Sequence, residues 1–154
     1  MNNNMIYNGV TSIVTKVGNL IYKEVNYENL TNELILREIF WLTNLEKYNI
    51  APKFIKRINN RIVMSYCGEP ITSEEAKSSN VQRQLLLIMK ILIENYCFYN
   101  DFKLDNTLIL NNKVSIIDFG WCPLIKEDYS CNNLIVSDLK SKPSGNWFTL
   151  FNNL

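Results

Sequence analysis

The sequence predicts a single domain of the α+β class, and three observations support this expectation. Residues 6–25 alternate apolar and polar side chains in short runs separated by turn residues, which is typical of antiparallel strands. The stretches 31–48 and 80–98 repeat apolar residues every three or four positions, which indicates helices. Two further apolar runs flank Asn111-Asn112 and indicate a β-hairpin. At 154 residues the chain can bury one core but is too short for two ordinary domains.

The composition excludes several classes of protein. Hydrophobic residues make up 47% of the chain and charged residues 20%, as in folded soluble proteins rather than disordered ones. A net charge of +1 gives no general attraction to nucleic acid or to an anionic membrane, so we expect neither as a partner. The chain has no histidine, which excludes catalysis by its own histidines and zinc sites with histidine ligands.

The expected location is the cytoplasm. Four scattered cysteines form no close pair, which is typical of reduced thiols: Cys67, Cys97, Cys122 and Cys131. The first residues have neither the basic nor the long apolar region of a secretory signal. The most apolar run, Leu85–Ile93, is too short to span a bilayer. Abundant Asn, Ile and Lys hint at an AT-rich genome such as that of a virus, for which the host cytoplasm is expected.

The first strands place a lysine on an apolar face. Residues 6–25 divide into three strands, with a turn at residues 18–19. In the third strand, alternation puts Ile21, Lys23 and Val25 on one face. The plainer interpretation is that the Lys23 stem covers apolar surface while its ammonium reaches solvent. A functional interpretation follows from the motifs described below.

The middle of the chain is predicted to contain two helices and a second hairpin. The first helix, at residues 31–48, is expected to end before residue 49. Residues 53–57 and 61–67 form the hairpin, and Gly68 and Pro70 are expected to break its second strand. Thr72–Glu75 has the spacing of a capping box. The helix at 80–98 is apolar nearly all round from residue 85 to 93, so we expect it to be buried.

Polar residues suited to phosphate chemistry gather at the open ends of the hairpin around residues 111–112. The strands at 107–110 and 114–117 are preceded by D-x-K-x-x-N (Asp101, Lys103, Asn106) and followed by D-F-G, beginning at Asp118. Because a hairpin brings its ends together, Asn106 and Asp118 are expected to lie close. Their oxygen atoms suit Mg²⁺, which takes few carboxylates and shares its shell with phosphates. Asp101 would orient or deprotonate an attacking hydroxyl, with Lys103 beside it to neutralise phosphate charge.

These two motifs, in this order and joined by a hairpin, resemble the catalytic loop H-R-D-L-K-P-x-N and the magnesium-binding D-F-G of protein kinases. Tyr99 and Asn100 stand where the family has His and Arg. The resemblance covers about residues 6–123 and implies a protein kinase-like fold, in which a small antiparallel N-lobe sheet with one helix precedes a reduced C-lobe. It divides a domain of residues 5–154 into an N-lobe at about 5–67, a hinge at about 65–70 and a reduced C-lobe at about 71–154. The C-lobe would contain a helix, the catalytic loop, the hairpin and a short tail, without the A-P-E phrase.

ATP and Mg²⁺ are the cofactors that this resemblance implies. Asn106 and Asp118 would hold the metal, Asp101 would be the catalytic base and Lys103 would stabilise the transferred charge. Lys23 would contact the α- and β-phosphates.

Glu38, on the first predicted helix, corresponds to the residue that holds this lysine in the family. Glu33 is the weaker alternative partner for Lys23. A solvent-exposed charge is the plainer interpretation of Glu38.

The resemblance also places the adenine and the phosphate loop. Gly9 is the only glycine of that loop, in N-G-V-T-S. Met64 would be the gatekeeper, and backbone groups of Ser65 and Cys67 would bond adenine. Ile21 stands where the family usually has a small alanine, which narrows the pocket.

Three functions are compatible with these motifs. The first is a minimal, active Ser/Thr-type protein kinase, similar to compact atypical kinases of the RIO or lipopolysaccharide-kinase type. The second is a pseudokinase that serves as a non-catalytic binding module, and the third is a small-molecule kinase of the aminoglycoside or choline type. The partner would be a protein or small-molecule hydroxyl acceptor. We also expect the apolar surface left by a truncated C-lobe to be covered by the tail after Cys122, a second copy of the chain or another protein.

Overall fold

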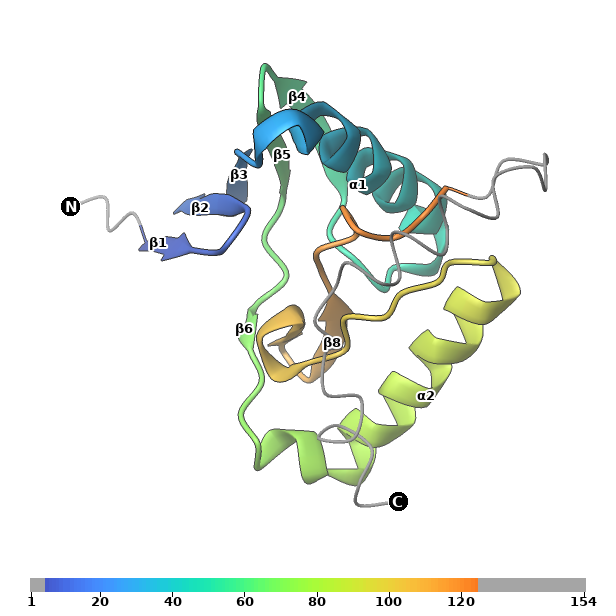
Figure 1. Ribbon diagram of the computed structural model, residues 1–154. Helices are drawn as coiled ribbons and strands as arrows, with labels where there is room; N and C mark the ends of the chain where they lie inside the picture. The colour runs from blue at the N-terminus through green and yellow to red at the C-terminus, as the bar shows by residue number, and fades with distance from the viewer. Residues whose placement is uncertain (1–4, 125–154) are drawn as a thin grey trace.

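The computed structural model describes residues 5–124 (Figure 1). Within these residues it contains a five-stranded antiparallel sheet, two α-helices and a three-stranded antiparallel sheet, which confirms the predicted α+β class. The larger sheet has the order β1-β2-β3-β5-β4 and the smaller one the order β6-β7-β8. The larger sheet consists of β1 (Met5–Asn8), β2 (Ser12–Val17), β3 (Leu20–Val25), β4 (Phe54–Ile58) and β5 (Arg61–Ser65). The other elements are α1 (Thr31–Leu45), β6 (Glu69–Pro70), α2 (Ser79–Glu94), β7 (Thr107–Leu110) and β8 (Lys113–Ile116).

The first three strands form two consecutive hairpins, as the alternating pattern predicted. In β3, Lys23 and Val25 are buried and Glu24 is exposed, so the lysine does share the apolar face. Gly18 has a φ of 59° in the turn between β2 and β3, where left-handed backbone favours glycine. On its other side β3 pairs with β5, with Lys23 opposite Ile62. Lys23 therefore lies on the central strand of the larger sheet.

Helix α1 lies against the larger sheet and ends close to the predicted position. It contacts β3, β4 and β5 (Figure 1), and its buried residues include Leu34, Ile35 and Leu42. A single 3₁₀ turn, Glu46–Tyr48, follows it. Asn49 then adopts a left-handed φ of 55°, which terminates the helical segment.

The chain after β5 differs from the prediction because it enters a second sheet. β5 ends at Ser65, two residues before the predicted end at Cys67. The prediction that Gly68 and Pro70 break this strand is wrong, because the strand ends before Gly68 and Glu69–Pro70 then pair with β7 as β6. Gly68 has a φ of 113°, and a Cβ atom there would lie 2.0 Å from the carbonyl oxygen of Ile109. The missing side chain thus lets two backbones come close enough to pair.

The segment that leads into α2 begins with the predicted capping box. The Glu75 amide donates to Thr72 Oγ1 at 3.1 Å, and the Thr72 amide donates to the Glu75 carboxylate at 2.8 Å. A 3₁₀ turn, Glu75–Lys77, follows. Ser78 then caps α2, since its hydroxyl accepts from the Val81 amide at 3.2 Å.

The prediction that the longest helix is buried nearly all round is wrong. α2 ends at Glu94 rather than near residue 98. Leu85 and Ile88 are no more than 2% exposed, whereas Leu87 is 56% and Ile93 is 70% exposed. Only one face contacts β8 and the core among the described residues. A run of apolar residues on every side of a helix does not tell which face packs inward.

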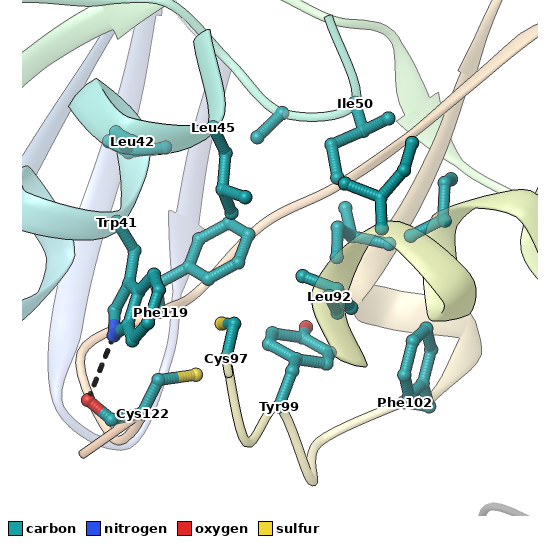
Figure 2. Close-up of a cluster of buried hydrophobic side chains, with 14 of the residues drawn as sticks. Trp41, Leu42, Leu45, Ile50, Leu92, Cys97, Tyr99, Phe102, Phe119 and Cys122 are labelled. Carbon is teal, nitrogen blue, oxygen red and sulfur yellow. Dashed lines mark hydrogen bonds between the residues drawn. The ribbon is translucent and has the colours of Figure 1, made fainter. Parts of the chain in front are cut away.

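An apolar core joins α1, α2 and the loops that precede β7 and follow β8 (Figure 2). Leu42 and Leu45 come from α1, Leu92 from α2, and Phe102 and Phe119 from the two loops. Both phenylalanines are at most 1% exposed. The loops that carry the polar motifs are therefore fixed by the same core as the helices.

The predicted folding back of the tail after Cys122 lies almost entirely outside the described part of the chain. Between residues 5 and 124, no helix is long and apolar enough to cross a membrane.

Candidate functional site

The β7–β8 hairpin brings the two polar motifs together, as predicted. Asn111 and Asn112, in its turn, have φ values of 50° and 65°, and this left-handed pair matches the twist of a two-residue hairpin. At the open end, the Ile117 amide donates to the Asn106 carbonyl oxygen at 3.1 Å. Asn106 and Asp118 therefore leave the smaller sheet side by side.

Lys23, Glu38 and Asp118 come from three separate elements and meet at one ammonium group. Lys23 Nζ lies 2.6 Å from Glu38 Oε2 and 3.0 Å from Asp118 Oδ1. Lys23 is 7% exposed and Glu38 is 2% exposed, so neither the solvent-reaching lysine nor the surface glutamate is correct. Glu33, the alternative partner, instead forms an ion pair with Arg37 on its own helix. The predicted pairing of Lys23 with Glu38 is confirmed.

The charge of Lys23 depends on these two carboxylates. Burial of the ammonium by itself lowers the pKa of Lys23, but the Asp118 and Glu38 carboxylates raise it by more. The net effect is a pKa above the ordinary value of 10.5. Lys23 is thus a buried cation at neutral pH, in contact with Asp118.

Asp118 has an unusual backbone that its neighbours hold in place. Its φ is 71°, in the left-handed region that few residues other than glycine adopt, although aspartate tolerates it better than most. The Tyr99 hydroxyl donates to the carbonyl oxygen of the preceding residue, Ile117, at 2.6 Å. The Tyr99 ring also contacts Phe119, with ring centroids 5.2 Å apart. Burial raises the pKa of Tyr99, so this hydroxyl stays protonated and keeps donating.

This role of Tyr99 was not predicted, because the sequence showed only that a tyrosine stands two residues before Asp101. A tyrosine next to a polar motif is a weak signal. The structure supplies the missing information, which is the position of the Ile117 carbonyl.

Asp101, Lys103 and Asn106 form a second cluster beside Asp118. Asn106 Nδ2 donates to Asp101 Oδ2 at 2.8 Å and to the Asp101 carbonyl oxygen at 3.2 Å. Lys103 Nζ lies 3.3 Å from Asp101 Oδ2. Asp101 and Asn106 are each 6% exposed, whereas the Lys103 side chain is 41% exposed. The carboxylate is therefore oriented from inside by an amide, and the lysine remains accessible.

A cleft of about 780 Å³ connects the two clusters. All nine residues predicted from the sequence line it: Gly9, Lys23, Glu38, Ser65, Cys67, Asp101, Lys103, Asn106 and Asp118. This volume lies within the range of small-molecule sites. A smaller hollow of about 210 Å³, on the opposite face of the larger sheet, contains none of these residues.

The oxygen ligands in the cleft suit a metal that is shared with a ligand rather than one held by protein alone. Among the described residues, no group of three or more His, Cys, Asp or Glu side chains converges as a metal site. Asn106 uses its amide nitrogen to contact Asp101, so the carbonyl oxygen of that amide is the atom left for a cation. With the Asp118 carboxylate, this gives two protein oxygens. Such a set fits Mg²⁺, which completes its shell with water and phosphate oxygens.

The inner wall of the cleft is apolar. Ile21 and Met64 both line it, beside Ser65 and Cys67 at the end of β5. The Ser65 amide donates to the Lys53 carbonyl oxygen at 3.0 Å, so this amide does not serve a ligand. The predicted contacts of Ser65 and Cys67 with a base remain predictions.

The roof of the cleft is the short loop between β1 and β2. The Gly9 amide donates to the Ser12 carbonyl oxygen at 2.8 Å, which closes the loop on itself. Gly9 does line the cleft, but its amide is engaged within the loop.

The mouth of the cleft contains a polar cluster that the sequence did not indicate. Glu69 Oε2 accepts from the Tyr7 hydroxyl at 2.7 Å, and Glu69 Oε1 accepts from the Tyr66 hydroxyl at 2.6 Å. Lys16 Nζ lies 3.9 Å from Glu69 and 3.8 Å from the centre of the Tyr66 ring. The Tyr66 hydrogen bond lowers the pKa of Glu69 and outweighs partial burial, with Tyr7 and Lys16 acting in the same direction. We call these four residues, Tyr7, Lys16, Tyr66 and Glu69, the mouth cluster.

The comparisons with known proteins found no relative of this chain. No protein-family model matches the chain, and no curated protein matches it significantly.

Proposed function

We propose that this chain is an ATP- and Mg²⁺-dependent phosphotransferase with a protein kinase-like fold, which acts on a hydroxyl group such as that of a protein Ser or Thr. One observation supports the proposal above all others. Nine residues, four from the two motifs at the ends of the β7–β8 hairpin and five from elsewhere in the chain, line one cleft of suitable size. Within it, Lys23, Glu38 and Asp118 form a buried charged group.

Each residue has a task that its position supports. Lys23, kept charged and fixed by Glu38, would bind phosphate oxygens of the nucleotide. Asn106 and Asp118 would hold Mg²⁺, which when bound neutralises charge on the phosphates. Residues Ile21 and Met64 would enclose the base on the apolar wall.

Asp101 would accept a hydrogen bond from the acceptor hydroxyl, orient its oxygen toward the terminal phosphorus and take its proton. The new bond joins that oxygen to phosphorus, the bond from this phosphorus to the bridging oxygen breaks, and ADP leaves. Lys103 would stabilise the charge of the phosphoryl group during transfer, since its ammonium is accessible 3.3 Å from Asp101.

A non-catalytic binding module is the second candidate, and the mouth cluster favours it. Tyr7 on β1 and Glu69 on β6 are joined directly across the mouth of the cleft. Together with Ile21 on the wall and the self-bonded Gly9 loop, this contact would leave less room for a nucleotide. On this interpretation the charged group supports a docking surface rather than phosphate transfer.

Calorimetric titration of ATP into the purified chain, with and without Mg²⁺, tests the first proposal. We expect binding to require Mg²⁺. It should weaken at least about tenfold in Asp118→Asn, because the buried Lys23 ammonium loses the Asp118 carboxylate. Glu24→Gln is the matched control, since Glu24 is exposed on the opposite face of β3 and outside the cleft. Absence of binding with and without Mg²⁺ would contradict the phosphotransferase and favour the binding module.

Asp101→Asn separates binding from catalysis. We expect this variant to bind Mg²⁺-ATP like the unaltered chain and to lose transfer to a hydroxyl acceptor by about 100-fold or more. Transfer of the ³²P label from ATP to an acceptor measures the loss. Equal transfer by both proteins would remove Asp101 from the mechanism.

A further inference from the structure

The turn that follows Asp118 is attached to α1 by a contact that the proposed chemistry does not use. The Trp41 indole nitrogen donates to the Cys122 carbonyl oxygen at 3.2 Å, and both residues are buried (Figure 2). The Cys122 amide in turn donates to the Phe119 carbonyl oxygen at 2.9 Å, which closes the turn. Asp118 therefore immediately precedes a turn whose last carbonyl is held by a side chain of α1.

Two further contacts attach this turn to the beginning of α1. Tyr27 and Trp121 meet edge to face, with ring centroids 5.5 Å apart at an angle of 80°. The Tyr27 amide donates to Thr31 Oγ1 at 2.8 Å, which fixes Tyr27 to the first residue of α1. Gly120, inside the turn, lies so close to α1 that a Cβ atom there would be 3.4 Å from the Leu34 carbonyl oxygen. The turn thus lies along α1, between the first residue of the helix and Trp41.

These contacts complete a series that begins at Glu38 and ends at Trp41, both on α1. Glu38 and Trp41 are three residues apart on α1 and so project from the same side of the helix. Glu38 holds Lys23, Lys23 pairs with Asp118, and the turn after Asp118 returns to Trp41. An outward shift or rotation of α1 would break the Trp41 and Glu38 contacts together. Trp41 itself does not line the cleft.

We infer that Trp41 is a positioning residue, which fixes Asp118 relative to Lys23 and Glu38 through the carbonyl of Cys122. The charged arrangement then forms within the chain itself, with no need for a modification or partner that moves α1 into place. The consequence for nucleotide binding rests on the proposed function. The coupling of α1 to the turn does not, and is measured separately.

Hydrogen exchange of the chain without nucleotide tests the coupling. Trp41→Phe keeps an aromatic ring and removes the indole donor. The amides of residues 118–122 should then exchange about fivefold faster, which is the change expected from the loss of one hydrogen bond. Thr43→Ala is the control, because Thr43 Oγ1 donates to Ile39 on the exposed side of the same helix. Unchanged exchange at residues 118–122 in Trp41→Phe, or an equal effect of Thr43→Ala, would overturn the inference.

A double-mutant cycle tests the consequence. Trp41→Phe and Glu38→Gln should each weaken Mg²⁺-ATP binding, and their combination should cost less than the sum, because both variants release the same arrangement. Additive effects would overturn the positioning role. If the unaltered chain binds no ATP, the proposed function fails, while the exchange experiment still decides whether Trp41 couples α1 to the turn.

Two measurements keep the inference testable if Trp41→Phe does not fold. In the unaltered chain, the Trp41 indole proton should exchange slowly with solvent in a ¹⁵N spectrum, and fast exchange would overturn the hydrogen bond. Tyr27→Leu, in a half-exposed position, should also accelerate exchange at residues 118–122, since it removes the edge contact with Trp121.

Discussion

At the scale of single residues, charge balance around Lys23 determines whether the site holds its shape. One ammonium faces two carboxylates in a place where Glu38 is 2% exposed. Removing one member of a buried ionic group leaves the charge of the others uncompensated, which costs more than the group contributes when complete. The site is therefore sensitive to any change that removes the cation.

Lys23→Met should lower the free energy of unfolding by about 3 kcal/mol at pH 7, because the buried Glu38 carboxylate loses the ammonium that balances its charge. The pKa of Lys23 is raised in the folded state, so its contribution is complete below its ordinary pKa of 10.5 and is lost as the pH rises further. Urea denaturation from pH 7 to pH 11 should show the difference between the two proteins shrinking only above about pH 10.5.

Lys53→Met is the matched control for this experiment. Lys53 also forms an ion pair, with Glu46 at 2.8 Å, but its side chain is 66% exposed. Its removal should change the free energy of unfolding by less than about 1 kcal/mol. Equal losses in the two variants would contradict the buried charged group.

Gly68 is the residue on which the junction between the two sheets depends. Gly68→Ala should lower the free energy of unfolding by about 3 kcal/mol, because its Cβ would meet the Ile109 carbonyl in a left-handed backbone. Gly18→Ala, also left-handed but with nothing near the new atom, should cost only about 1 kcal/mol. Urea denaturation measures both, and similar losses would show that β6 does not approach β7 closely.

At the scale of elements, periodicity predicted the parts whose neighbours are close in sequence. In each of these parts, a strand pairs with the next strand along the chain or is joined to it by a turn that contains asparagine. They are the three strands of residues 5–25, the β4–β5 hairpin and the β7–β8 hairpin. β6 could not be predicted, because two residues form a strand only when β7, almost forty residues later, lies beside them. The faces of α2 could not be predicted either, since apolar residues occupy both.

Helix α2 offers a direct test of its two faces. Leu87→Glu should change the free energy of unfolding by no more than about 0.5 kcal/mol, because Leu87 is 56% exposed. Leu85→Ala should cost about 3 kcal/mol, since Leu85 is fully buried. Thermal and urea denaturation of both variants check this. A large loss in Leu87→Glu would mean that this face is covered by another part of the chain or by a second copy.

The convergence of the candidate site residues was predicted more completely than the fold, for a physical reason, while their chemical roles stay predictions. Two short motifs fix residue types at set distances along the chain, and one hairpin suffices to bring Asn106 and Asp118 together. Contacts that depend on distant backbone groups were missed, such as those of Tyr99 with Ile117 and of Trp41 with Cys122. Their donors are ordinary core aromatics in sequence, and only the fold identifies the carbonyl that each one meets.

At the scale of the whole molecule, the mouth cluster connects the two sheets. Tyr7 belongs to the edge strand of the larger sheet, and Glu69 belongs to β6 of the smaller one. Both carboxylate oxygens of Glu69 accept from tyrosine hydroxyls. Burial, aided by the hydrogen bond to Glu69, raises the pKa of Tyr66 to about 12, so its hydroxyl remains a donor at neutral pH. One ionised carboxylate thus links the edge strand of the larger sheet directly to the smaller sheet.

This link through Glu69 gives the fold a predictable response to acid. The pKa of Glu69 is lowered in the folded state, so its contribution to stability is complete above its ordinary pKa of 4.5 and is lost as the pH falls through the lowered value. Urea denaturation from pH 7 to pH 3 should therefore find Glu69→Gln less stable than the unaltered chain at neutral pH, with the difference closing in acid. Tyr7→Phe should reproduce part of the loss and add little to Glu69→Gln, because both remove the same link between β1 and β6. A stability difference that does not shrink between pH 7 and pH 3, or full additivity of the two variants, would show that this link does not stabilise the fold.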